Sequence, residues 1–134
     1  MTTPITVPAP FLYNAELIEW RDVDTGLWRV DRGDRDYSTW PVRLAGCAGR
    51  ELTDPGGPEA LAEIQRRVPA GTRGVLLTLK PDKFGDRKLA RVIYQAADRQ
   101  LHDLAVELIQ DGWLAPWNGR GPQPKPPWPR RARP

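Results

Sequence analysis

YSTWPVRLAGC, residues 37–47, is the segment from which the predicted architecture of this chain follows. Its aromatic and β-branched residues predict a strand. The cluster TDPGG at residues 53–57 then breaks the chain, and Pro58 suits the first turn of a helix. The next apolar residues are spaced for one buried helix face: Leu61, Ile64 and Val68. The segment therefore predicts a strand followed by an inserted helix.

Further strands are predicted on both sides of this unit. Residues 11–20 and 27–30 have strand-like patterns before it, and residues 75–79 and 89–94 have them after it. A second helix is expected from one apolar stripe: Leu101, Leu104, Ala105, Leu108 and Ile109. The order β-β-β-α-β-β-α, with a helix after the third of five strands, is that of an OB-fold barrel. The predicted class is α+β, mainly β with two helices.

The ends of the chain differ in composition from this domain. Residues 1–10 hold three prolines and predict an extended N-terminal arm. Residues 11–117 form the expected OB-fold domain, a size sufficient for one core. Residues 118–134 form a tail rich in proline and arginine, which cannot be a long helix because proline lacks the N–H donor. We expect this tail to be extended and available to dock on a protein assembly.

The basic residues are mostly arginine. The chain has 20 Lys and Arg against 17 Asp and Glu, and only four of the 20 are lysines. Arginine binds phosphate bidentately, so this bias suits a nucleic-acid partner. A GC-rich genome that favours arginine codons explains the same bias, and composition does not choose between the two.

Export and membrane insertion are not indicated. No apolar run approaches the roughly 20 residues that cross a bilayer. The N-terminus lacks the basic and apolar regions of a signal peptide. Cys47 is the only cysteine, which excludes an internal disulfide. We expect a protein of the cytoplasm, or one within a virus particle, with no membrane contact.

The first candidate site segment is RDVDT, residues 21–25. Its carboxylates, Asp22 and Asp24, would share one face of a strand or converge on a cation in a turn. Oxygen ligands of this kind are what hard divalent cations prefer. A solvated turn is the alternative for a pattern this common.

Two further segments contribute arginines and a possible base. Arg43 and Glu51 belong to VRLAGCAGRE, residues 42–51, and Arg87 ends the turn DKFGDR, residues 82–87. Converging arginines and a carboxylate suit anion binding and acid–base chemistry. The alternatives are an ion pair of Arg43 across the sheet, a capping role for Glu51 and a solvated hairpin at Arg87.

These segments, in this order, resemble the staphylococcal nuclease (thermonuclease) family over residues 13–117. DVDT is similar to the family pattern Asp-Gly-Asp-Thr, and VRLAGCAGRE to Val-Arg-Leu-x-Gly-Ile-Asp-Ala-Pro-Glu. DKFGDR is similar to Asp-Lys-Tyr-Gly-Arg, with one additional residue before the arginine.

The resemblance implies a role for each matched residue. Asp24, and more weakly Asp22, would bind the metal, and Glu51 would activate the attacking water. Arg43 would bind phosphate, and Arg87 would stabilise the charge that develops on it. The implied nucleic-acid contacts are Arg43, Arg87 and Lys83.

The departure from the family pattern that matters most for metal binding is at Ala48. Ala48 stands where the family has its second aspartate ligand for calcium. Because calcium prefers six or more oxygen ligands, we expect weak calcium binding, and other divalent cations are possible.

The resemblance thus implies a metal-dependent phosphodiesterase, a nuclease acting on single-stranded DNA or RNA. The alternative is a barrel of the same kind that has lost catalysis and binds nucleic acid or protein, for example as a structural component of a virus particle. Ala48 favours the binding module. The nuclease is favoured by the joint presence of Asp24, Arg43, Glu51 and Arg87.

Overall fold

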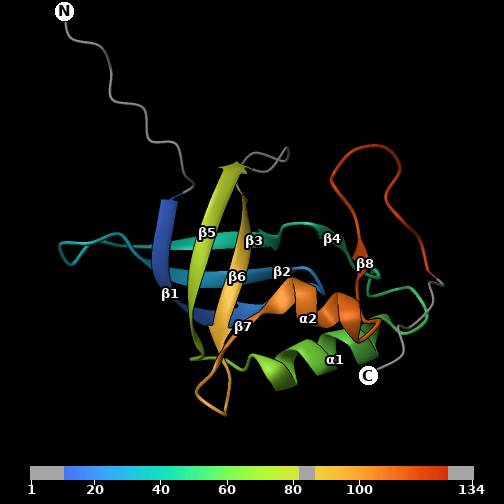
Figure 1. The fold of residues 1–134 in the computed structure, drawn as a ribbon, viewed down its shortest axis with the longest axis horizontal. Helices are drawn as coiled ribbons and strands as arrows, with labels where there is room; N and C mark the ends of the chain where they lie inside the picture. The colour runs from blue at the N-terminus through green and yellow to red at the C-terminus, as the bar shows by residue number, and fades with distance from the viewer. Residues whose placement is uncertain (1–10, 82–86, 127–134) are drawn as a thin grey trace, which may run out of the picture.

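The computed structural model of the chain describes residues 11–81 and 87–126 (Figure 1). The long strands are β1 (Phe11–Trp20), β2 (Thr25–Asp31), β3 (Tyr37–Leu44), β5 (Arg73–Pro81) and β6 (Lys88–Gln95). The helices are α1 (Gly57–Arg67) and α2 (Leu104–Gln110). The short strands are β4 (Cys47–Ala48), β7 (Leu101–Asp103) and β8 (Ala115–Pro116). Lys83, the predicted arm and residues 127–134 of the predicted tail lie outside the described residues.

The five long strands form a closed barrel. They follow one another in the order β3-β2-β1-β5-β6, and every neighbouring pair in this order is antiparallel. β3 also pairs with β6 in parallel, with Val42 opposite Lys88 and Leu44 opposite Ala90. This pairing joins the two ends of the sheet. The predicted α+β class, an OB-fold-like barrel with two helices, is confirmed.

Alternation along the strands separates the core from the outer face. In β2, Trp28 and Val30 are fully buried, while Arg29 and Asp31 are exposed. Trp20 packs edge-on against Trp28, with ring centroids 6.4 Å apart. Apolar burial of this kind is the main stabilising contribution to such a barrel. The largest fully buried side chains are Trp28, Leu17, Leu44, Ile64, Leu76, Leu104, Leu108, Leu114, Val23, Val30, Val42 and Val68.

The helix α1 starts as its sequence predicts. Pro58 lies in the first turn, and Ile64 and Val68 are fully buried. Gly57 is required for steric reasons, because a Cβ there would lie 2.2 Å from the carbonyl oxygen of Glu51. The segment carrying Glu51 is therefore in direct contact with the start of α1.

A buried arginine joins the two helices. The Arg67 side chain is 8% exposed and bonds to three carboxylates: Glu63 at 2.9 Å, Glu107 at 3.0 Å and Asp111 at 2.6 Å. Glu63 precedes Arg67 on α1, whereas Glu107 lies on α2 and Asp111 ends that helix. The network therefore fixes α1 against α2.

His102 extends this network from β7. Its Nδ1 lies 2.7 Å from a Glu107 carboxylate oxygen, and its Nε2 lies 3.2 Å from Asp98. The Tyr94 hydroxyl donates to the other Glu107 oxygen at 2.6 Å. Glu107 therefore links the barrel strands β6 and β7 to Arg67.

Two predicted boundaries were wrong. Leu101 is not part of the second helix: it lies in β7 and is 68% exposed. The helix begins later because the Asp103 side chain accepts the Val106 N–H and caps it. The third strand ends at Leu44, not Cys47, because Gly46 turns the chain with a φ of 80°.

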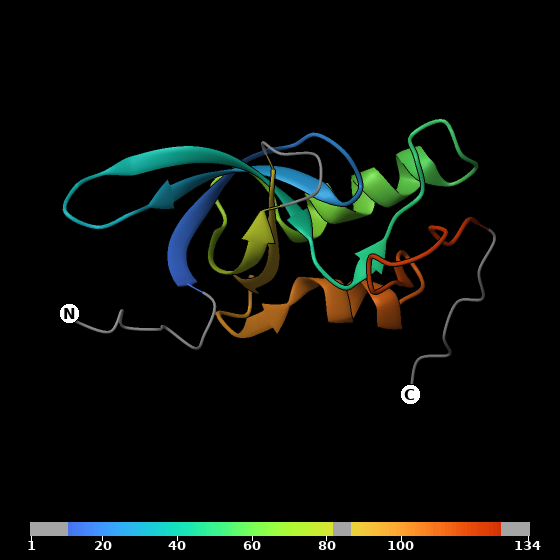
Figure 2. The ribbon, with the colours of Figure 1, turned by 90° about the horizontal axis from the view of Figure 1, so that it is seen from above.

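The turn between β2 and β3 projects away from β4 and β8 in both views (Figures 1 and 2). The barrel thus has one end near the helices and the short β4–β8 pair, and an opposite end at this turn. Among the described residues, no helix has the length and apolar character needed to span a membrane.

Candidate active site

Strand pairing brings the predicted segments to the same end of the barrel. Thr25, which begins β2, is opposite Arg43 in β3. Arg43 is in turn opposite Leu89 in the parallel β3–β6 pair, close to Arg87 in the chain. Residues far apart in the sequence therefore meet where β2 begins, β3 ends and β6 begins.

Arg43 is held by contacts within the protein. Its Nη2 lies 3.5 Å from Asp24 Oδ2, and the two side chains are 11% and 13% exposed. Its guanidinium also donates to the carbonyl oxygens of Leu44 and Cys47, each at 3.3 Å. The ion pair across the sheet, one of the alternatives for Arg43, is thus present. It positions the guanidinium in the predicted site.

Arg87 joins the same group of residues through a threonine. Arg87 Nη1 donates to Thr25 Oγ1 at 3.4 Å, and that hydroxyl donates to Asp24 Oδ1 at 3.1 Å. Asp24 therefore accepts from Thr25 on one oxygen and faces Arg43 on the other. The two predicted arginines flank one carboxylate.

Asp22 contributes a second carboxylate whose ionised form is destabilised. Its pKa is raised, chiefly because the half-buried carboxyl loses solvation. The Val23 N–H, which donates to Asp22 Oδ1 at 2.7 Å, opposes this rise. The carboxylates of Asp24 and Glu51 raise the pKa further, and the Arg87 cation lowers it. The carboxyl groups of Asp24 and Glu51 and the guanidinium of Arg87 are therefore close enough to Asp22 to affect its ionisation.

Glu51 lies at the exposed edge of the site. Its side chain is 65% exposed, and Oε1 lies 3.7 Å from Lys125 Nζ. Its backbone N–H donates a hydrogen bond to Asp54 Oδ2 at 2.9 Å. Because the Lys125 pair is exposed, it is weak and leaves the Glu51 carboxylate accessible to water.

The segment after β8 covers part of the site. The Trp117 ring lies under the Arg43 guanidinium at 5.4 Å, and its backbone N–H donates to the Gly46 carbonyl at 3.1 Å. Lys125 reaches Glu51 from the same segment. Neither Trp117 nor Lys125 was predicted as a site residue, because a contact between the end of a chain and its middle leaves no local pattern.

Val23 and Ala48, which differ from the thermonuclease pattern that the sequence resembles, are both fully buried. Val23 replaces a glycine, but it is fully buried and is not among the non-glycine residues with positive φ. A glycine is therefore not needed for backbone conformation at this position. Ala48 is fully buried in β4, where it pairs with Ala115 of β8.

The Cys47 thiol takes no part in acid–base chemistry. It is fully buried, and this burial raises its pKa to about 12. It therefore remains protonated near neutral pH and donates weakly to the Leu44 carbonyl at 3.6 Å.

The residues fit a shared cation better than a complete metal cage. Within residues 11–81 and 87–126, no group of three or more His, Cys, Asp or Glu side chains is arranged to hold a metal ion. Asp22 and Asp24 supply two carboxylates, and a nearby cation would favour the ionised form of Asp22. Magnesium-type ions are commonly bound by one or two carboxylates together with phosphate oxygens and water. The donor set suits a cation bound jointly with a phosphate.

Comparison with protein families and with curated proteins gives no match to this chain. The resemblance to the thermonuclease family therefore stays a prediction.

Proposed function

We propose that this chain is a metal-dependent phosphodiesterase that hydrolyses single-stranded DNA or RNA. One observation supports this more than any other: Arg43 and Arg87 converge on Asp24, directly for Arg43 and through Thr25 for Arg87. Two guanidiniums beside carboxylates suit a phosphate that binds together with a cation.

Each residue has a distinct part in the proposed reaction. A water oxygen attacks phosphorus, the bond to the leaving ester oxygen breaks, and that oxygen takes a proton from solvent. Glu51 accepts the proton of the attacking water, since its carboxylate is exposed next to the buried charges. Arg43 and Arg87 stabilise the charge on the phosphoryl oxygens. A divalent cation at Asp24 and Asp22, calcium or magnesium, would add positive charge there.

A second candidate function is a binding module without catalysis. It is favoured by Arg43, whose contacts with Asp24, Leu44 and Cys47 are all internal, and by the alanine at position 48. Such a module would bind nucleic acid or protein as part of a larger assembly, in the cytoplasm or within a virus particle. It would bind a single strand and leave it intact.

The test is cleavage of a labelled single-stranded oligonucleotide by the purified chain. Calcium, magnesium and a chelator are compared, with DNA and RNA substrates in parallel. We expect cleavage with at least one cation, none with the chelator, and a large loss in Arg87→Ala. Arg66→Ala is the matched control, because it removes the same charge from the exposed face of α1. A wild-type chain that cuts neither substrate with either cation would refute the enzyme and favour the binding module.

A further inference from the structure

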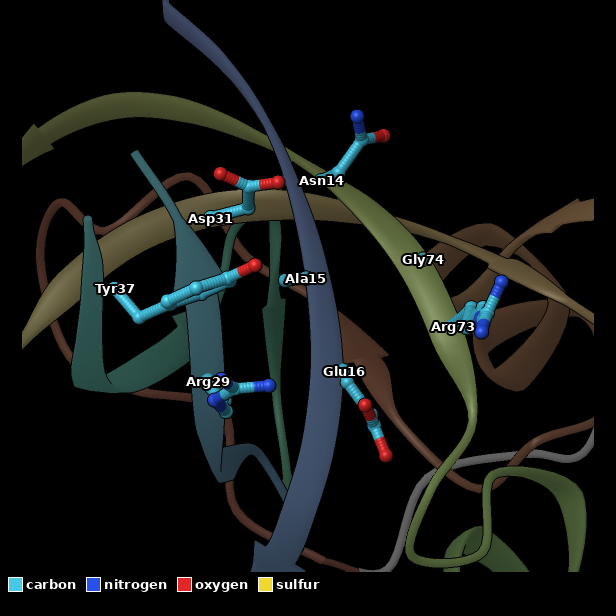
Figure 3. Close-up of a pocket in the computed structure, with 8 residues that line it drawn as sticks. All are labelled: Asn14, Ala15, Glu16, Arg29, Asp31, Tyr37, Arg73 and Gly74. Carbon is cyan, nitrogen blue, oxygen red and sulfur yellow. The ribbon is translucent and has the colours of Figure 1, made fainter. Parts of the chain in front are cut away.

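A pocket lies outside the proposed active site, on the outer face of the barrel. It crosses β1, β2 and β5 and has a volume of about 380 Å³. Small-molecule sites commonly occupy roughly 300–1,000 Å³, so this volume is sufficient for a ligand group. Polar side chains dominate its lining, as Figure 3 shows: Asn14, Glu16, Arg29, Asp31, Tyr37 and Arg73.

The register of the strands places the charged side chains of this pocket side by side in a row. Glu16 of β1 is opposite Arg29 of β2 on one side and opposite Arg73 of β5 on the other. Residues directly opposite on neighbouring strands share a face, so the carboxylate lies between two guanidiniums (Figure 3). With Asp31 included, the two acidic and two basic groups cancel. The pocket therefore has no net preference for an anion.

An aromatic surface borders the row. The Arg29 guanidinium stacks on the Tyr37 ring, 4.0 Å from its centroid, and Tyr37 remains 49% exposed. Tyr37 is opposite Asp31 in the β2–β3 pair. A flat ligand group can stack at this tyrosine while carboxylate, guanidinium and amide groups bond to its edge.

The pocket and the proposed active site lie along the same face of the β2–β3 hairpin. Paired residues on this face lead from the active site to the pocket: Thr25 with Arg43, Leu27 with Pro41, Arg29 with Thr39 and Asp31 with Tyr37. Inward residues such as Trp28 and Val42 alternate with them and are fully buried. At a rise of ~3.3 Å per residue, Tyr37 lies roughly 20 Å along the strand from Arg43.

We propose that this pocket binds a base of the single strand whose phosphate lies at Arg43 and Arg87. A nucleobase has a π-face for Tyr37 and an edge with both donors and acceptors, which match a neutral pocket of mixed groups. A phosphate does not match, because Glu16 and Asp31 would repel it. The inference rests on the proposed function for the position of the strand, and it adds a base-binding subsite remote from the reacting phosphate.

The test is equilibrium binding in the presence of a chelator, so that no strand is cut. A labelled strand of about eight nucleotides, within the usual site size of an OB-fold, is compared with a dinucleotide. The dinucleotide is too short to reach from Arg43 to Tyr37. We expect Tyr37→Ala to weaken binding of the longer strand about tenfold, the usual effect of losing one stacked base. Binding of the dinucleotide should not change, and Tyr37→Phe, which keeps the ring, should bind both as the wild type does.

Salt dependence separates a base from a phosphate in the pocket. Tyr37→Ala and Arg73→Ala should each leave the slope of log affinity against log salt unchanged. A slope reduced by about 0.7 in Arg73→Ala would mean that the pocket holds a phosphate, and would overturn the assignment. Equal affinity of Tyr37→Ala and wild type for the longer strand, or no binding of that strand by the wild type, would also overturn it.

Cleavage and binding, measured together, test the proposed function and the base-binding subsite separately. Cleavage is measured on the wild type and binding on both the wild type and Tyr37→Ala, so the two measurements refer to different claims. Cleavage by the wild type with no effect of Tyr37→Ala on binding refutes the subsite alone. The reverse result, a binding defect without any cleavage, refutes the enzyme and supports the subsite.

Discussion

The guanidinium of Arg43 lies 3.5 Å from the carboxylate of Asp24, and both side chains are nearly buried. Asp24 precedes β2, whereas Arg43 is near the end of β3. The pair therefore connects the start of one barrel strand to the end of its neighbour. It also keeps one arginine beside the carboxylate that is proposed to bind the cation.

Removing Asp24 should destabilise the fold as well as the site. In Asp24→Ala, Arg43 keeps its bonds to the Leu44 and Cys47 carbonyls but loses the carboxylate with which it forms an ion pair. The substitution also removes the hydrogen bond that Asp24 Oδ1 accepts from the Thr25 hydroxyl. A hydrogen bond to a charged group is worth about 2 kcal/mol, so we expect a loss of at least this size in the free energy of unfolding. Urea denaturation measures it. An unchanged midpoint would show that the pair contributes nothing to stability.

Arg67 should matter far more to stability than its neighbour Arg66. Arg67→Met leaves three carboxylates, Glu63, Glu107 and Asp111, close together without their shared cation. Breaking a buried ion pair in this way costs about 3–5 kcal/mol. Within the described part of the chain Arg66 pairs with Glu63 alone, on the exposed face of α1, so Arg66→Ala should lower stability far less. Similar thermal denaturation of the two variants would contradict the role of Arg67 in joining the helices.

The stability of the fold should decline as the pH rises above the pKa of a free histidine. The Glu107 carboxylate, and to a smaller extent the Asp98 carboxylate, raises the pKa of His102 above 6.5. A histidine with a raised folded-state pKa contributes stability that is complete below 6.5 and is lost as the pH rises through the folded value. The thermal midpoint of the wild type should therefore fall in this range, and His102→Gln should remove that part of the fall. A wild-type profile that the substitution leaves unchanged would exclude His102 as the cause.

A carboxylate at position 48 should couple folding to a divalent cation. Ala48 is fully buried in β4, so Ala48→Asp introduces a buried charge and should lower the thermal midpoint in chelator. Calcium should raise the midpoint of the variant more than that of the wild type, because a ligand that binds only the folded state stabilises it. A variant that calcium does not rescue would mean that position 48 does not face the cation.

The order of the elements could be predicted because its signals are local. Strand alternation in residues 11–20, the break at residues 53–57 and Pro58 all act within a few residues. Leu101 was assigned to the wrong element because an apolar stripe does not reveal that Asp103 caps the helix after it. The short β4–β8 pair joins residues far apart in the chain, and no local pattern indicates it.

The candidate site could be predicted only in part. Asp22, Asp24, Arg43, Glu51 and Arg87 were chosen for their order and resemblance, and their mutual effects place them near one another. The link that Thr25 makes between Arg87 and Asp24 depends on side-chain geometry, as does the stacking of Arg43 on Trp117. The charged row of the outer pocket depends on the register of three strands, which no single segment specifies.

The most direct test of the proposed function separates catalysis from binding in Arg87→Ala and Glu51→Ala. Both kcat and the Kd for a single-stranded oligonucleotide are measured, with Arg66→Ala as the control. An arginine that acts on the transition-state charge contributes on the order of 10³-fold to turnover. We therefore expect a loss of that order in kcat for Arg87→Ala and a large loss for Glu51→Ala, with little change in Kd. Weaker binding with no effect on turnover, or cleavage that persists unchanged in both variants, would contradict the account.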